Sequence, residues 1–160
     1  MIETSAPTEP TVERRVFEAW SIQVPAAFAE TFVDADGYWH GYDEHRSVSL
    51  SSFVISEARD PVRADRILRQ AAPPLDGPPV DRVPPGLLGR AATCAAPQPA
   101  RASQLLSGLL ATDGRLLLVT ITGDDLEWAR RVWLSIRSHA APVQSPRGRR
   151  KGRARQRQGC

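Results

Sequence analysis

The densest group of side chains that could do chemistry lies between residues 34 and 45. It combines carboxylates with imidazoles, which together could bind a transition metal or perform acid–base catalysis; its members are Asp34, Asp36, His40, Asp43, Glu44 and His45. The spacing fits no established motif, because only Asp34 and Asp36 resemble the start of a calcium loop and the rest of that loop is missing. We therefore expect a solvated turn without a metal or a cofactor, with a metal site and catalysis as the alternatives.

Three aromatic residues stand among these charged groups, at Tyr38, Trp39 and Tyr42. Aromatic rings beside polar groups are typical of protein interfaces. The sequence therefore predicts that these three residues form a partner-binding surface.

Candidate nucleophiles do not form a catalytic set in this sequence. Ser49 and Ser51 alternate with apolar residues in the stretch 47–55, and no Gly-x-Ser-x-Gly elbow or phosphate-binding glycine loop occurs. The two cysteines, Cys94 and Cys160, are too few for a disulfide framework or for a zinc site by spacing. The sequence indicates a protein that is not an enzyme.

The charge of the chain is divided unevenly along its length. The formal net charge is +3, yet residues 141–160 hold seven of the 21 Lys and Arg residues and none of the 18 acidic ones, which leaves −4 on residues 1–140. The seven cations could bind nucleic acid or an anionic surface through counterion release, and without aromatic residues they would not read sequence; a solubilising extension, or a contact with the acidic domain, is the alternative. They are Arg147, Arg149, Arg150, Lys151, Arg153, Arg155 and Arg157.

The sequence shows neither a membrane span nor an export signal. No apolar run approaches the roughly 20 residues that cross a bilayer, and residues 1–15 are polar, without a hydrophobic segment of the signal-peptide type. We expect a cytoplasmic protein with no membrane span.

The clearest structural signal is a hairpin followed by a helix. Apolar runs at 105–112 and 115–122 flank Asp113-Gly114, a pair that favours a two-residue hairpin turn. Asp124 and Glu127 then form a capping box for a helix that reaches Ser138. The helical period places apolar residues, including Trp128 and Trp133, on one arc that faces the core.

The remaining elements follow from alternation and from turn residues. Asp60-Pro61 indicates a helix start, with Val62, Ile67 and Leu68 facing inward. Six prolines between residues 72 and 86 indicate a surface loop. The expected strands are 16–24, 30–33, 38–42, 47–55 and 87–95.

Several of these segments together resemble the Mog/PsbP/DcrB-like domain family. The resemblance is carried by FEAWSIQVPAAF (Phe17–Phe28), SVSLSSFVI, the Asp60-Pro61 helix and GRLLLVTITGDDLEWARRVWLSIR, and it covers residues 15–139. It implies an α+β fold in which helices flank an antiparallel β-sheet, an α/β/α sandwich of the Mog/PsbP type. It also implies binding rather than turnover, because members of this shape bind or hold other proteins.

The sequence thus predicts one domain with two disordered ends. A disordered arm at 1–14 precedes the α+β domain at 15–139, and a disordered basic tail follows at 140–160. The expected function is that of a non-enzymatic protein-binding or chaperone-like module of unknown partner. The alternative is nonspecific nucleic-acid or anionic-surface binding through the tail.

Overall fold

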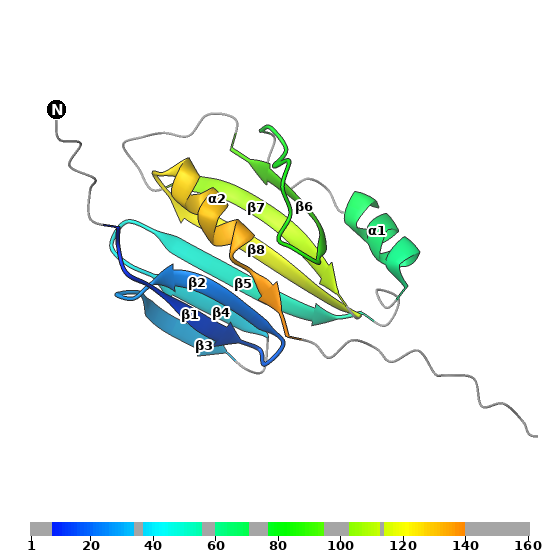
Figure 1. Ribbon diagram of the computed structural model, residues 1–160, viewed down its shortest axis with the longest axis horizontal. Coiled ribbons are helices and arrows are strands. Elements are labelled where there is room, and N and C mark those ends of the chain that lie inside the picture. The colour runs from blue at the N-terminus through cyan, green and yellow to red at the C-terminus, as the bar shows by residue number, and fades with distance from the viewer. Residues whose placement is uncertain are drawn as a thin grey trace, which may run out of the picture.

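The computed structural model describes residues 8–33, 37–55, 60–70, 77–94, 103–112 and 114–139. These residues form two antiparallel sheets and two helices (Figure 1). The elements are β1 (Thr11–Val16), β2 (Trp20–Pro25), β3 (Ala29–Val33), β4 (Tyr38–Tyr42), β5 (Ser47–Val54), α1 (Pro61–Gln70), β6 (Leu88–Thr93), β7 (Ser103–Thr112), β8 (Arg115–Gly123), α2 (Leu126–Leu134) and β9 (Arg137–Ser138).

The larger sheet has six strands in the order β3-β4-β5-β8-β7-β6, and every neighbouring pair is antiparallel. The predicted hairpin is confirmed, because β7 pairs with β8 across Gly114, whose φ is 78°. Glycine takes this left-handed conformation without steric cost. β8 is a central strand, between β5 and β7, and it carries apolar residues on both of its faces.

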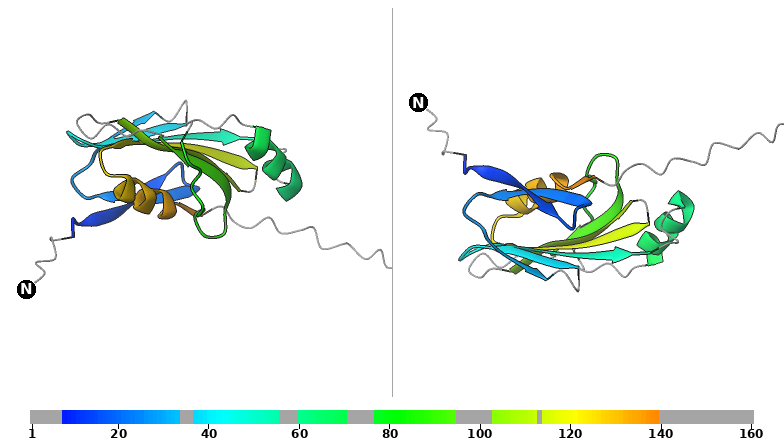
Figure 2. Two further views of the ribbon diagram at one scale, coloured as in Figure 1. Left: turned by 90° about the horizontal axis from the view of Figure 1, so that it is seen from above. Right: turned by 90° about the horizontal axis from the view of Figure 1, so that it is seen from below.

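One face of this sheet, the inner face, carries the core. Figure 2 shows α2 and the small sheet β1-β2-β9 lying against that face, so the molecule has two main layers. Trp128 and Trp133 of α2 are 7% and 0% exposed, which confirms their predicted place in the core. The inner-face residues beneath them include Trp39, Val48, Leu50, Leu106, Leu110, Leu117, Val119 and Ile121.

The predicted helix-flanked α/β/α sandwich is wrong. The described residues are mostly antiparallel strand, and a three-stranded sheet takes much of the covering position that the prediction gave to helices. The reason lies near the N-terminus, where two short strands pair with each other in place of one strand joining the large sheet. Within the described ranges, the outer face of the large sheet carries only α1, which packs at one end through Ala64 and Leu68 against Ala111 and Leu116.

The predicted strand over residues 16–24 is interrupted by a tight turn. Phe17 and Glu18 have φ values of 55° and 59°, and the amide of Ala19 donates to the carbonyl of Phe17. Val16 before the turn and Trp20, Ile22 and Val24 after it keep a period of two, so the sequence pattern alone reads as one strand. β1 begins at Thr11, so the domain starts before the predicted boundary at residue 15.

The closing helix is shorter than the sequence predicted. It begins at Leu126, and its cap is Asp125 rather than Asp124, since the Asp125 carboxylate accepts a hydrogen bond from the Trp128 amide at 3.1 Å. The helix ends at Leu134, and the next residues form β9, which pairs with β2. The backbone of the last predicted helical turn therefore completes the small sheet.

The helix after Asp60-Pro61 is confirmed, with one difference in its inward face. The Asp60 carboxylate accepts a hydrogen bond from the Val62 amide at 2.9 Å, which caps the first turn. Ala64 and Leu68 are buried, whereas Val62 is 69% exposed. The inward prediction for Val62 is therefore wrong, because this residue lies on the part of the helix that turns away from the sheet.

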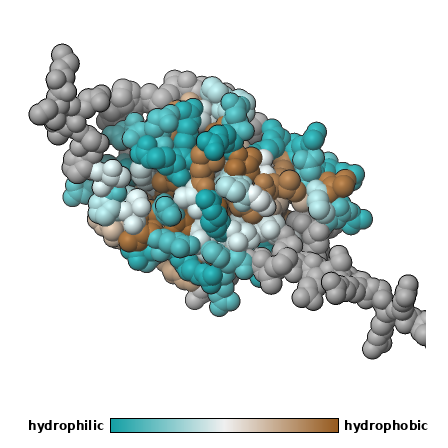
Figure 3. Space-filling view, in the orientation of Figure 1, coloured by the Kyte–Doolittle hydropathy of each residue, from teal (hydrophilic) through white to brown (hydrophobic). Residues whose placement is uncertain are grey.

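The layer formed by α2 and the small sheet leaves some apolar side chains partly exposed. In the space-filling view, hydrophilic residues occupy most of the periphery and hydrophobic residues gather nearer the middle (Figure 3). The apolar side chains that pack on the core while only partly buried include Val80, Val83, Leu87 and Leu134. Neither helix of the described ranges is long and apolar enough to cross a membrane.

Candidate functional site

The outer face of the large sheet carries an aromatic row along β4. Alternation within the strand puts Tyr38, His40 and Tyr42 on this face and sends the intervening residues to the inner face. The three rings are stacked, with centroids 6.3 Å apart for Tyr38 and His40 and 5.2 Å apart for His40 and Tyr42. Tyr42 is 40% exposed. The row is therefore ordered and accessible.

One hydroxyl group of β5, that of Ser49, contacts two members of this row. The Ser49 hydroxyl lies 2.8 Å from His40 Nδ1 and 3.3 Å from the Tyr38 hydroxyl. Ser51 stands opposite Tyr38 and Ser47 opposite Tyr42 in the same register. We call Tyr38, His40, Tyr42, Ser47, Ser49 and Ser51 the outer-face cluster. Its members include no carboxylate, ammonium or guanidinium group, and they combine stacking surfaces with hydrogen-bond donors and acceptors.

The polar surface continues onto the next strand of the sheet. Thr120 and Thr122 of β8 stand opposite Ser49 and Ser47, so hydroxyl groups from two neighbouring strands share the outer face. The helix α1 packs only at the other end of this face, around Leu116. The side chains of the outer-face cluster thus point away from the core.

Trp39 does not belong to this surface. Its side chain is 2% exposed and lies in the core, with Nε1 donating to a Glu30 carboxylate oxygen at 2.9 Å. A Cβ on Gly41 would lie 2.5 Å from the Trp39 ring, so glycine makes room for it. The prediction that Trp39 faces a partner is therefore wrong, and the alternation of β4 was the signal that separates it from Tyr38.

The sequence missed His40 as a neighbour of the two tyrosines on one surface. It grouped this histidine with the carboxylates of the following turn, because those residues are close in the chain. The same alternation places His40 with Tyr38 and Tyr42. The signal was present in the sequence but depended on the strand boundaries.

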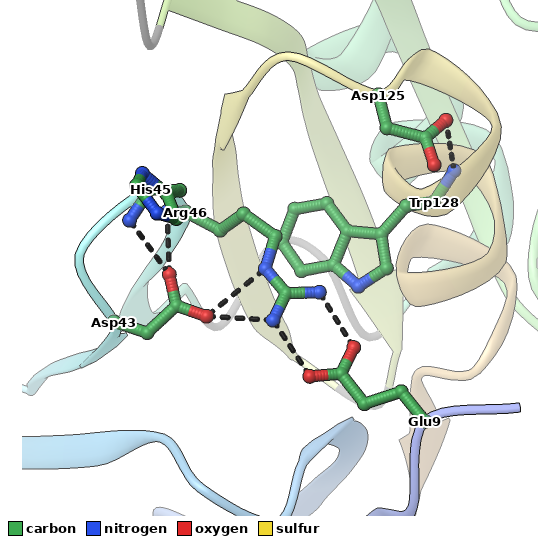
Figure 4. Close-up of polar contacts among 6 residues, drawn as sticks. All are labelled: Glu9, Asp43, His45, Arg46, Asp125 and Trp128. Atoms are coloured by element: carbon green, nitrogen blue, oxygen red, sulfur yellow. Dashed lines mark hydrogen bonds and ion pairs between the residues drawn. The ribbon is translucent and has the colours of Figure 1, made fainter. Parts of the chain in front are cut away.

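Asp43, in the turn between β4 and β5, has a structural partner in Arg46. Asp43 Oδ2 accepts hydrogen bonds from Arg46 Nε at 3.0 Å and Nη2 at 2.6 Å, and Glu9 accepts a bidentate pair from the same guanidinium at 2.7 and 2.8 Å (Figure 4). The guanidinium carbon also lies 5.1 Å from the Trp128 ring centroid and 5.6 Å from that of Phe28. Arg46 therefore ties the N-terminal segment to the β4–β5 turn and to α2.

The charges of this cluster stabilise one another. Hydrogen bonds from the Arg46 side chain lower the pKa of Glu9 from its usual value of 4.5. Burial by itself would raise the pKa of Asp43, but hydrogen bonds from the Arg46 side chain and from the amides of His45 and Arg46 outweigh it, so the pKa falls below 3.8. The bonds to Glu9, followed by those to Asp43, raise the pKa of Arg46 despite its partial burial. Asp43 is thus a charged anchor rather than a proton donor.

The predicted charged group of residues 34–45 is dispersed. Asp34 and Asp36 lie outside the described residues. His40 lies on the outer face, Asp43 binds Arg46, and Glu44 and His45 are exposed. Among the described ranges, no group of three His, Cys, Asp or Glu side chains is arranged to hold a metal ion.

Two serine–histidine contacts lack the geometry of a catalytic triad. His139 Nε2 lies 2.7 Å from Ser21 Oγ and 3.6 Å from Glu13, so one nitrogen faces both groups, whereas a triad places the acid on the other nitrogen. Ser21 is also only 1% exposed. At Ser49 and His40, the surrounding strands use their backbone amides in the sheet ladder, which removes the donors that would bind an oxyanion.

The basic residues of the tail, from Arg147 to Arg157, lie outside the described residues, and their predicted role stays a prediction. Comparison with known proteins adds no identity. The chain matches no model of a known protein family, and no curated protein matches it.

Proposed function

We propose that this protein is a non-enzymatic, protein-binding or chaperone-like module that holds its partner on the outer face of the large sheet. The observation that carries the proposal is the outer-face cluster: three stacked rings, tied to a serine hydroxyl, on a sheet face that α1 covers only at its other end. Tyrosine and histidine side chains provide both apolar contact area and hydrogen bonds, which suits a protein partner.

The chemistry of the cluster defines the kind of partner. The hydroxyl groups of the cluster favour a partner that offers backbone or side-chain amides. Its rings favour apolar side chains of the partner that pack against them. A cytoplasmic location is part of this proposal.

The test is co-purification under native conditions with and without the exposed rings. We expect the wild-type protein to recover one stoichiometric protein, and the double substitution Tyr38→Ser and Tyr42→Ser to lower the affinity for that protein by about tenfold or more, as for interface aromatic anchors. The control is Val62→Ser on α1, which changes another exposed side chain. Equal recovery by all three proteins would reject the outer face as the binding site.

A second candidate function rests on the composition of the tail. Seven cations without an acidic residue in 141–160 favour contact with a polyanion. We expect the full chain to bind single-stranded RNA with a log–log salt slope as steep as about −5, if all seven cations contact phosphates. A chain that ends at Ala141 should lose most of this affinity at low salt. Unchanged affinity after the truncation would contradict this function.

A further inference from the structure

The two edges of the six-stranded sheet differ in how they are protected. At one edge, the segment around Pro79 bridges to Ala92 of β6, with hydrogen bonds from the Val80 amide to Ala91 and from the Thr93 amide to Pro78. At the other edge, β3 pairs only with β4 in the described part of the chain. No described strand thus pairs with the other side of the β3 backbone.

β3 has one of the features that usually prevent pairing at an exposed edge, the inward-facing charge of Glu30, and lacks the others. All five of its residues, AETFV, are exposed, and the strand contains no lysine, no proline and no bulge. Phe32 and Val33 are 45% and 39% exposed. By contrast β1, an edge of the small sheet, carries Glu13, Arg14 and Arg15. The β3 edge of the large sheet is therefore more apolar than the β1 edge of the small sheet.

We propose that β3 pairs with the β3 strand of a second copy of this chain, antiparallel and with the two-fold axis at Thr31. In this register Ala29 stands opposite Val33 of the second copy, and Glu30 stands opposite Phe32. Small or apolar residues then meet on the outer face, and no two like charges are directly opposite. The strand is thus complementary to itself, and the two sheets continue into one.

The single charge of β3 is already balanced within each copy. Glu30 lies 3.5 Å from Arg14 and accepts the hydrogen bond of Trp39. The carboxylate is therefore held toward its own domain, and the arginine offsets its charge when the two copies approach. Phe32 lies on the same face, and its ring centroid is 5.5 Å from that of Phe17, so each copy presents a small aromatic pair beside the axis.

The size of this contact predicts a weak dimer. A ladder of five residues buries less area than the roughly 1,200–2,000 Å² that stable interfaces bury. We expect a reversible equilibrium that sedimentation velocity detects as a rise in mass with concentration. A wild-type protein that stays monomeric up to the highest concentration that remains in solution would overturn the proposal.

The first variant places like charges at the axis. Thr31→Lys sets two lysines directly opposite each other, so the dissociation constant should rise about fivefold or more. Thr31 is exposed in the single copy, so its fold should be retained, as a thermal melt would show. Val62→Lys, on exposed α1, is the matched control and should dimerise like the wild type. Equal dimerisation of the two variants would overturn the proposal.

The second variant reports the register and does not depend on the equilibrium alone. In a background with Cys94 and Cys160 replaced by serine, Thr31→Cys should form a disulfide-linked dimer under mild oxidation, because opposed residues of paired strands lie within disulfide reach. Ala29→Cys should not, since its counterpart in the second copy lies far along the ladder. Cross-linking of Ala29→Cys at the same rate as Thr31→Cys would reject this register. The measurement uses purified protein, so it is independent of any partner on the outer face.

Discussion

Replacing Trp133 with alanine should lower the free energy of unfolding by about 3–5 kcal/mol, the range for removing a fully buried aromatic side chain. The ring is 0% exposed, and it packs so closely on β7 that a Cβ on Gly108 would lie 2.7 Å from two of its atoms. No neighbour fills the resulting cavity without moving a strand or α2, because the site is enclosed by both layers of the core.

The same substitution removes a hydrogen bond. Trp133 Nε1 donates to the Arg82 carbonyl at 2.9 Å, which ties α2 to the segment before β6. Trp133→Phe should therefore cost less than Trp133→Ala, because the phenyl ring keeps most of the packing and only the bond is lost. Chemical denaturation of the wild type, Trp133→Phe and Trp133→Ala measures the loss of the hydrogen bond and the further loss of packing. A loss below about 1 kcal/mol for Trp133→Ala would contradict the buried position.

The Arg46 cluster should make stability depend on pH in the acidic range. At neutral pH we expect Arg46→Met to lower the free energy of unfolding by about 2 kcal/mol, since it removes charge-assisted hydrogen bonds and a cation–π contact that solvent partly screens. Methionine keeps much of the packing against Trp128, so the difference reports mainly on the charges. Urea unfolding across a pH series measures it.

The sign of the pH dependence follows from the lowered pKa values. Glu9 and Asp43 have lower pKa values in the folded protein than their ordinary 4.5 and 3.8, so their contribution is fully present above those values. It is lost as the pH falls through the folded values, when both carboxylates take up protons. The difference between wild type and Arg46→Met should therefore be constant near neutral pH and shrink below about pH 4.

An exposed ion pair supplies the control for this prediction. Arg69 and Asp65 of α1 are in contact at 2.7 Å, but their side chains are 74% and 49% exposed. Arg69→Met should change stability by less than about 1 kcal/mol at any pH, because water screens such pairs. If Arg69→Met and Arg46→Met had equal effects, the contacts of Arg46 with Glu9 and Trp128 would not stabilise the fold as described.

The sequence predicted correctly those elements that depend on residues close together in the chain. The Asp113-Gly114 hairpin and the inward tryptophans of α2 follow from turn chemistry and from helical periodicity, both of which act over a few residues. The cap of α2 was misplaced by one residue, since Asp124 and Asp125 are both suitable caps and only the geometry selects Asp125.

Long-range pairing could not be predicted in the same way. The small sheet joins β2 to β9, and β9 consists of two polar residues that continue the polar face of the predicted helix. A strand of two residues has no periodicity of its own, so the sequence pattern predicted that the helix continues through residues 137 and 138. The turn at Phe17 and Glu18 was hidden because neither residue is a usual left-handed type.

The candidate site was predicted in part. Tyr38 and Tyr42 lie on the outer face as exposed or half-exposed residues, whereas Trp39 lies in the core. Alternation places Trp39 on the opposite face from the two tyrosines, once β4 is known to be a strand with a neighbouring strand on each side. The Arg46 cluster depends on Glu9, which is distant in the chain, so no local spacing indicated it.

The pairing of β9 with β2 has a consequence for how the chain folds. The bond between Ser21 and His139 joins residues 118 positions apart, so the small sheet cannot close until nearly the whole domain has been synthesised. Antiparallel proteins with such distant contacts fold slowly, on a scale of about milliseconds to seconds. During that interval β1 and β2 would pair as an isolated hairpin, with their apolar sides in water, and the nascent protein would be most prone to aggregation before its last strand arrives.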